Sequence, residues 1–163
     1  MANYKRIFLD GYSYFITVAT HQKNPILIEN IKLLREAFRY SKEQYAYQIE
    51  AIVILPDHFH MIITPQDVRE YPKIISAIKR YFTRYCEPKY FVHLEQSSSR
   101  QQRGMKPVWQ KRFYEHTIRN EKDMYEKLQY IYHNPVKHSY VKDAREWIYS
   151  SLNTRRVRNH APK

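Results

Sequence analysis

The sequence predicts an α+β fold: a four-stranded antiparallel sheet with packed helices. Runs of β-branched and aromatic residues alternate with segments whose apolar residues recur at helical spacing. Their order along the chain is strand, helix, strand, strand, helix, strand, helix. A length of 163 residues suits one domain with a core of its own.

The first half of the chain predicts a strand, a helix and a hairpin. Residues 13–20 (SYFITVAT) have strand composition, and the segment HQKNP then turns the chain. Residues 30–43 place apolar side chains at helical spacing. Two further strands, 48–55 and 58–64, are separated by only two residues, Pro and Asp. Such a short connection makes them antiparallel neighbours.

The second half predicts two more helices and a fourth strand. Residues 72–86 form a helix that begins with a proline, which a first helical turn tolerates. Residues 94–106 are polar and predict a mobile loop, and 108–119 resume strand composition. A last helix covers 120–134, and Pro135 should end it. With short connections, this order fits the ferredoxin-like or RRM-like arrangement.

The charge of the chain points to a polyanionic partner. It has 28 Lys+Arg against 16 Asp+Glu, a formal net charge of +12. Such an excess favours nucleic acid or an anionic membrane surface, and the alternative is that it serves solubility alone. The single cysteine excludes an intramolecular disulfide, and no apolar stretch approaches the length of a spanning helix. Because the start lacks the features of a secretory signal, we expect a cytoplasmic protein without a membrane partner.

The organisation predicts one domain over residues 1–151 and a basic tail over 152–163. The tail carries Arg155, Arg156 and Arg158. It is either a disordered arm or one that contacts phosphates.

Two histidines interrupt the otherwise apolar strand at 58–64. Since side chains of a strand alternate between its faces, His58 and His60 share one face, and Phe59 lies on the other. A pair of imidazoles can bind a divalent metal if a third ligand comes from elsewhere. The alternative is that both rings only hydrogen-bond at a sheet surface.

The last predicted helix offers partners for these histidines. Tyr130 and Asn134 are four residues apart and therefore share a helical face. That face lies beside the apolar stripe of Met124, Leu128 and Ile131, so both side chains should border the sheet. The carboxamide of Asn134 could complete a metal site, and the phenol of Tyr130 could meet a bound phosphate.

Four segments in this order resemble a known family. PDHFHMII resembles the HUH motif, in which a bulky hydrophobic residue separates two histidines. VWQKRFYEHTIRN, YIYHNPVKHS and WIYSS resemble the REP-associated tyrosine transposases, relatives of the single-tyrosine insertion-sequence transposases. The resemblance covers most of the chain and implies the HUH endonuclease fold, a sheet with packed helices as predicted above.

The resemblance also implies roles for individual residues. His58 and His60 bind the metal, Tyr130 is the nucleophile and Asn134 is the third ligand. His116 matches a recurrent histidine that we expect near the site, without a ligand role. Ser139 stands where a glycine is common, and the polar loop at 94–106 looks longer than usual.

The expected reaction is metal-dependent nicking and joining of single-stranded DNA. Mg²⁺ or Mn²⁺ is favoured because an incomplete protein shell leaves room for waters and substrate oxygens. Attack by the tyrosine gives a 5'-phosphotyrosine and a free 3'-hydroxyl, and an adjacent hairpin of a repetitive extragenic palindrome is the implied recognition element. The protein is expected to be a monomer or a homodimer. The candidate DNA contacts are Lys79, Arg80, Lys111, Arg112, Lys137, Arg155 and Arg156.

Two other functions are compatible with parts of the sequence. One is a non-catalytic, RRM-like nucleic-acid-binding protein, although no clear aromatic pair of the RNP type is present. The other is a basic structural or membrane-surface protein, which leaves the arrangement of His58, His60, Tyr130 and Asn134 without an explanation.

Overall fold

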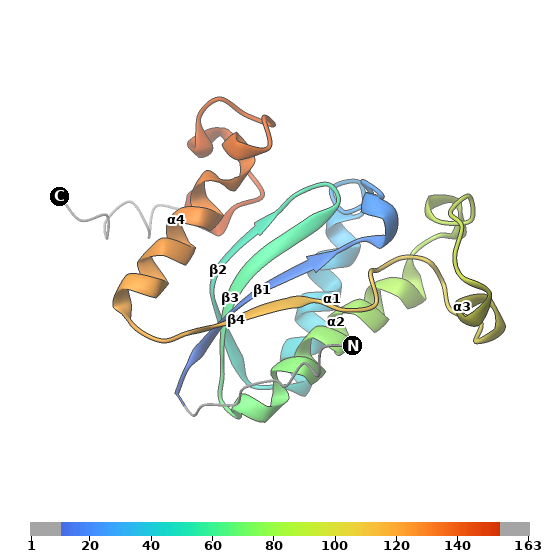
Figure 1. The fold of residues 1–163 in the computed structure, drawn as a ribbon, viewed down its shortest axis with the longest axis horizontal. Coiled ribbons are helices and arrows are strands. Elements are labelled where there is room, and N and C mark those ends of the chain that lie inside the picture. Colours follow the sequence, from blue (N-terminus) through green and yellow to red (C-terminus); the bar gives the residue numbers. More distant parts are fainter. Residues whose placement is uncertain (1–10, 154–163) are drawn as a thin grey trace.

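The fold is a single antiparallel sheet with helices on both faces (Figure 1). A computed structural model of the protein describes residues 11–153. The strands are paired in the order β2-β3-β1-β4, which confirms the predicted four-stranded sheet and its ferredoxin-like order. Their bounds are Ser13–Ala19 for β1, Tyr47–Ile54 for β2, His58–Pro65 for β3 and Tyr114–Ile118 for β4.

Two helices cover one face of the sheet and one covers the other. Helices α1 and α2 lie together on one face, and α4 lies on the opposite face (Figure 1). The short helix α3 is part of the long connection between α2 and β4. The helix bounds are Ile31–Gln44 for α1, Tyr71–Tyr85 for α2, Ser98–Gln102 for α3 and Glu121–Lys137 for α4.

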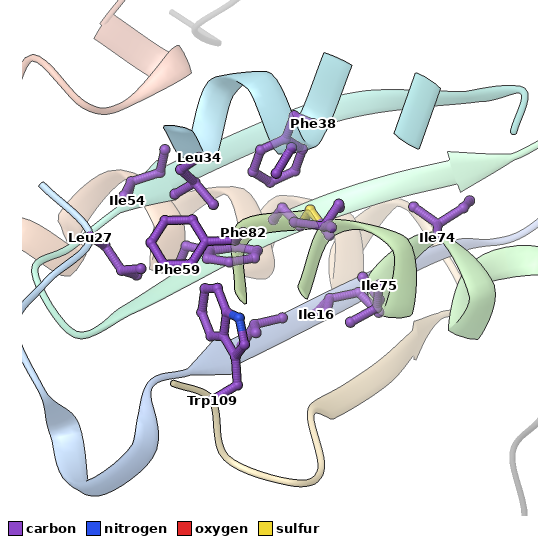
Figure 2. Packing of buried hydrophobic residues seen from close by; sticks show 14 of the residues in the cluster. Ile16, Leu27, Leu34, Phe38, Ile54, Phe59, Ile74, Ile75, Phe82 and Trp109 are labelled. Carbon is purple, nitrogen blue, oxygen red and sulfur yellow. The ribbon is translucent and has the colours of Figure 1, made fainter. Parts of the chain in front are cut away.

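The larger core lies between the sheet and the α1/α2 layer (Figure 2). Ile16 of β1 and Phe59 of β3 point into it, and both are fully buried. The Phe59 ring meets Phe38 of α1 edge-on, with 5.5 Å between ring centroids, and Trp109 at 6.1 Å. Phe82 of α2 packs on the same indole at 5.1 Å. These aromatic contacts fix which face of β3 points inward.

A smaller core lies between the sheet and α4. Phe15 of β1 and Ile62 of β3 point into it, which is the opposite face from Ile16 and Phe59. The apolar stripe predicted for the last helix supplies the other side, with Ile131 fully buried. The remaining members are Ala51, Val53, Ile118 and Leu152, with Met124, Leu128, Tyr132 and Trp147 packed against them.

A tight hairpin sets the start of β3. The Leu55 N–H donates to the His58 carbonyl at 2.8 Å and closes the turn made by Pro56 and Asp57. The two strands run antiparallel from there, as the short connection predicted. His58 is therefore the first residue of β3, one of the two inner strands, and lies beside the turn.

Helix α4 continues past the proline that was expected to end it. It runs to Lys137 with Pro135 inside, so the predicted end at Asn134 is wrong by three residues. Pro135 lacks the N–H that would bond to Ile131, but it lies in the last turn and is buried. The His138 N–H still donates to the Asn134 carbonyl at 3.1 Å, so the helical path is kept with one bond missing.

The connection between α2 and β4 also differs from the prediction. Within the expected loop at 94–106, residues Ser98–Gln102 form α3. The expected strand at 108–119 is reduced to β4, because Trp109 turns into the core and its indole N–H donates to the Lys79 carbonyl at 3.1 Å. Trp109 keeps only an isolated bridge to Thr20.

At the end of the described part, Leu152 packs in the smaller core. Arg155, Arg156 and Arg158 of the expected tail lie outside the described residues. Within residues 11–153, no helix is both long and apolar enough to cross a membrane.

The core packing predicts the effect of truncating Phe59. The change Phe59→Ala opens a cavity in the layer that orients β3, so we expect the free energy of unfolding to fall by about 3–5 kcal/mol. Urea unfolding followed by circular dichroism measures this loss. Ile148→Ala is the control, because Ile148 is 76% exposed and should change stability by less than about 0.5 kcal/mol. Equal losses in both variants would contradict the assignment of Phe59 to the core.

Candidate active site

The two histidines of β3 point toward α4. Phe59, between them, lies in the larger core, so His58 and His60 lie on the opposite face, as strand alternation predicts. Their ring centroids are 4.9 Å apart. His60 is only 4% exposed, whereas His58 is partly exposed beside the hairpin turn.

A hydrogen bond at Nδ1 orients each imidazole. The Asp57 carboxylate accepts from His58 Nδ1 at 2.7 Å, and Thr17 Oγ1 lies 2.7 Å from His60 Nδ1. Partners of this kind fix the ring and its tautomer in metal-binding histidines. They leave Nε2 of each ring as the atom available to a ligand. His60 Nε2 is buried and has no hydrogen-bond partner among the described residues.

The phenol of Tyr130 lies beside this pair. Its ring centroid is 5.1 Å from that of His60 and 5.7 Å from that of Phe15, in edge-on contacts. Tyr130 is 38% exposed, so a substrate can reach it. Lys137 Nζ lies 5.0 Å from the centre of the Tyr130 ring. A phenol, an imidazole and a cation therefore meet on one face of the sheet.

Asn134 lies one helical turn beyond Tyr130 and is almost completely buried, with 1% exposed. Neither its Oδ1 nor its Nδ2 has a hydrogen-bond partner in the described part of the chain. An unsatisfied buried polar group costs about 1–3 kcal/mol. Unpaired buried atoms on both Asn134 and His60 are what a site built for a ligand would leave.

The candidate metal donors on this face are two imidazoles and a carboxamide. Within residues 11–153, no group of three or more His, Cys, Asp or Glu side chains is placed to bind a metal ion. A metal at the histidine pair would therefore need a donor of another kind, and the oxygen of Asn134 is such a donor. Nitrogen and oxygen donors of this kind suit a divalent cation.

The surroundings of His60 keep it neutral. Burial lowers the pKa of His60 to about 3, helped by the charges of His58, His138 and Lys137. The ring is therefore unprotonated at neutral pH, which is the form that binds metals.

Comparison with known proteins identifies the family to which the chain belongs. A family model described as "Transposase IS200 like" matches residues 9–134, which span the sheet, the histidine pair and α4 through Asn134. The chain belongs to this transposase family.

Its relatives indicate the branch of the family. The transposase is 34% identical over 154 residues to the REP-associated tyrosine transposase of Escherichia coli (strain K12), covering 93% of this chain and 83% of the relative. A Haemophilus influenzae protein assigned to the same group is 38% identical over 154 residues, covering 93% and 86%. The chain is thus an enzyme of the REP-associated tyrosine transposase group, not a non-catalytic module or a structural protein.

A solved structure shares the fold. It is a REP-associated tyrosine transposase bound to a REP hairpin, with a TM-score of 0.81 and 32% sequence identity. The match covers 99% of this chain and 89% of that one. It confirms the sheet-and-helix architecture described above.

The site contains a third histidine that sequence reasoning missed. The His138 ring lies 5.2 Å from that of His58, just beyond the end of α4. Partial burial and the charge of His58 lower its pKa. Ser139 follows with φ of 61°, a left-handed conformation that explains why glycine suits this position. His138 lies four residues beyond Asn134 and so continues the helical face of Tyr130 and Asn134, but the helix was expected to end at Asn134.

His116 is near α4 rather than at the histidine pair. Its Nε2 lies 3.0 and 2.8 Å from the two carboxylate oxygens of Asp123, which also accepts the Arg119 N–H at 3.2 Å. Burial raises the pKa of the Asp123 carboxyl, but these hydrogen bonds outweigh it and the pKa is lowered. The pair joins β4 to the first turn of α4, the helix that carries Tyr130.

The expected DNA contacts fall into separate places. Lys137 lies at the Tyr130 ring. Lys79 and Arg80 are on α2, beyond the opposite face of the sheet, with Lys111 and Arg112 in the segment that leads to β4. The remaining two, Arg155 and Arg156, belong to the part of the chain that is not described.

Acid should destabilise the metal-free transposase through His60. The pKa is about 3 in the folded state and about 6.5 in an unfolded chain, so the unfolded chain takes up the proton first. The stabilisation that comes from neutral His60 is fully present above about pH 6.5 and is lost as the pH decreases toward 3. We expect a loss of about 2 kcal/mol between pH 7.5 and pH 5, measured by urea unfolding in EDTA.

The matched variant for this pH dependence is His60→Asn, which removes the titrating group. Its stability should change much less over the same range. The same slope in both proteins would show that His60 does not carry the effect.

The link between His116 and Asp123 should hold the start of α4. Asp123→Ala removes the acceptor for two hydrogen bonds, so we expect a loss of about 1–3 kcal/mol in unfolding free energy. Amide hydrogen exchange in the first turn of α4 should also accelerate. Glu126→Ala, at an exposed position of the same helix, is the control. Unchanged exchange in Asp123→Ala would rule out this anchoring role.

Proposed function

We propose that the transposase cuts and rejoins single-stranded DNA through a covalent bond between Tyr130 and a 5'-phosphate. The observation that carries the proposal is the contact between the Tyr130 ring and the His60 ring, beside buried nitrogen and oxygen atoms that have no hydrogen-bond partner within residues 11–153. His58, His60 and Asn134 are proposed as the metal-binding residues.

Mg²⁺ or Mn²⁺ fits these residues. His58 and His60 would bind through Nε2 and Asn134 through Oδ1, which accounts for the unpaired atoms of His60 and Asn134. When bound, the ion would supply positive charge beside the scissile phosphate and offset the repulsion between its oxygens and the nucleophile. Asp57 and Thr17 hold the two rings in place for this role.

Tyr130 performs the bond exchange. Its phenolic oxygen attacks phosphorus and forms a phosphotyrosine bond, while the bond from phosphorus to the 3'-oxygen breaks. The phenol loses its proton and the departing 3'-oxygen gains one. The Lys137 ammonium near the ring offsets negative charge on the phenol as the proton leaves. One phosphoester replaces another, so a 3'-hydroxyl can reverse the step and join strands without an external energy source.

The proposed substrate is a DNA hairpin with an adjacent single strand. One tyrosine can cut one strand, and an unpaired strand is more easily threaded onto a site at a sheet surface. The structural relative is bound to a REP hairpin, and its fold covers nearly all of this chain. We therefore assign a hairpin of a repetitive extragenic palindrome as the recognition element.

Covalent capture tests the reaction. The transposase is incubated with Mg²⁺ or Mn²⁺ and a hairpin oligonucleotide labelled at its 3' end, because the 5'-phosphotyrosine retains the downstream fragment. We expect a labelled adduct that survives denaturing electrophoresis, and we expect EDTA to abolish it. Tyr130→Phe should give no adduct.

Tyr125→Phe is the matched control, because Tyr125 is exposed on the same helix. It should form the adduct at the parent rate. Asn134→Ala should lower the rate at least tenfold and weaken Mn²⁺ binding measured by calorimetry. An adduct that persists in Tyr130→Phe would overturn the assignment of the nucleophile.

A further inference from the structure

A row of rings extends from the candidate active site to an exposed tyrosine. The ring centroids of Tyr130 and His60 are 5.1 Å apart, those of His60 and His58 4.9 Å, and those of His58 and His138 5.2 Å. The row continues beyond these residues to Tyr140, whose ring centroid lies 6.3 Å from that of His138. None of the roles assigned above uses Tyr140.

The end of α4 fixes the position of Tyr140. Ser139 is left-handed, with φ of 61°, and its N–H donates to the Val136 carbonyl at 2.9 Å. The Tyr140 N–H donates to the Pro135 carbonyl at 3.0 Å. These two bonds form a Schellman motif, a common cap at the C-terminal end of a helix. Tyr140 is therefore positioned by the same helix that carries Tyr130.

Trp147 supports the ring of Tyr140. The two ring centroids are 5.4 Å apart, and the ring planes differ by 31°. The indole N–H of Trp147 donates to the Ile54 carbonyl at 2.9 Å, which anchors the tryptophan to the end of β2, and its own carbonyl accepts from the Asn153 side chain. Tyr140 is nevertheless 44% exposed. A supported ring with open area is a surface on which another flat ring can stack.

Positive charge near this ring favours a nucleotide as the occupant. The charges of Lys137 and Lys23 both lower the pKa of His138, so both ammonium groups lie within electrostatic reach of that ring. Both lysines are exposed. Sites for unpaired strands combine cations that contact the backbone with aromatic side chains on which bases stack. An apolar protein segment would use the ring but would leave both cations without a role.

We propose that the Tyr140 ring, supported by Trp147, stacks on one base of the unpaired strand beside the histidine pair. The proposal rests on the proposed function for its substrate. Tyr140 is two ring contacts away from His58, so it would reach the base of a nucleotide at or next to the phosphate bound there. Every base has a flat face, so the contact would position the strand without reading its sequence.

Fluorescence anisotropy with a labelled hairpin that carries an unpaired strand tests the proposal. Every protein in the experiment also carries Tyr130→Phe, so that no adduct forms and the result does not depend on cleavage. Tyr140→Leu removes the ring and should lower the affinity about fivefold or more. Tyr140→Phe keeps the ring and should bind within twofold of the parent.

Removal of single bases from the DNA gives an independent readout with Tyr140 unchanged. An abasic nucleotide is placed at each position of the unpaired strand in turn. At one position, or two neighbouring ones, it should lower the affinity about as much as Tyr140→Leu does. The same abasic nucleotide should cost the Tyr140→Leu protein less than twofold. The fluorescence of 2-aminopurine at that position should be quenched on binding to the parent, and much less on binding to Tyr140→Leu.

Tyr125→Leu is the matched control, because Tyr125 is an exposed tyrosine in the first half of α4, and it should bind within twofold of the parent. Unchanged affinity in Tyr140→Leu would overturn the proposal, as would an equal loss in Tyr125→Leu. A loss in Tyr140→Phe equal to that in Tyr140→Leu would show that the hydroxyl makes the contact, which would also overturn stacking. If no abasic position loses its effect in Tyr140→Leu, the ring has a structural role and the proposal is wrong.

Discussion

The register of β3 at the centre of the sheet determines where both imidazoles point. Phe59 is clamped between Phe38 and Trp109 in the larger core, and a strand places its neighbours on the other face. His58 and His60 therefore point toward α4 and cannot turn inward without expelling Phe59. A slip of one residue would bury both imidazoles in an apolar layer and expose the phenylalanine. Hydrophobic packing on one face of the sheet thus positions polar chemistry on the other.

The site keeps polar atoms in a state that costs stability. Nε2 of His60 and the amide of Asn134 have no hydrogen-bond partner among the described residues, and both are buried on the face of the sheet where α4 packs. An apolar replacement would pack at lower cost, since an unsatisfied buried group costs about 1–3 kcal/mol. Their presence is therefore better explained by a ligand than by folding.

Much of the architecture could be predicted from the sequence, because the periodicity of apolar residues determines each element and its inward face. The shared face of His58 and His60 followed from strand alternation alone, and the proximity of Tyr130 from helical spacing. Features set by tertiary contacts could not be predicted: Pro135 stays helical because its turn is buried. His138 continues the spacing of Tyr130 and Asn134, and it was missed because Pro135 was expected to end the helix at Asn134.

Electrostatic roles were the least accessible to sequence reasoning. Lysines and arginines on a helix are equally compatible with a solvated face and with phosphate contacts. Only the fold shows which of them lie together on one surface. His116 illustrates the same limit, since its partner Asp123 is seven residues away, at the start of a different element.

The site itself can be tested by anomalous diffraction from crystals of the transposase soaked in Mn²⁺. A single strong peak at coordination distance from His58, His60 and Asn134, next to the Tyr130 hydroxyl, is the expected result. A peak elsewhere on the sheet, or none at these residues at saturating Mn²⁺, would contradict the proposed site.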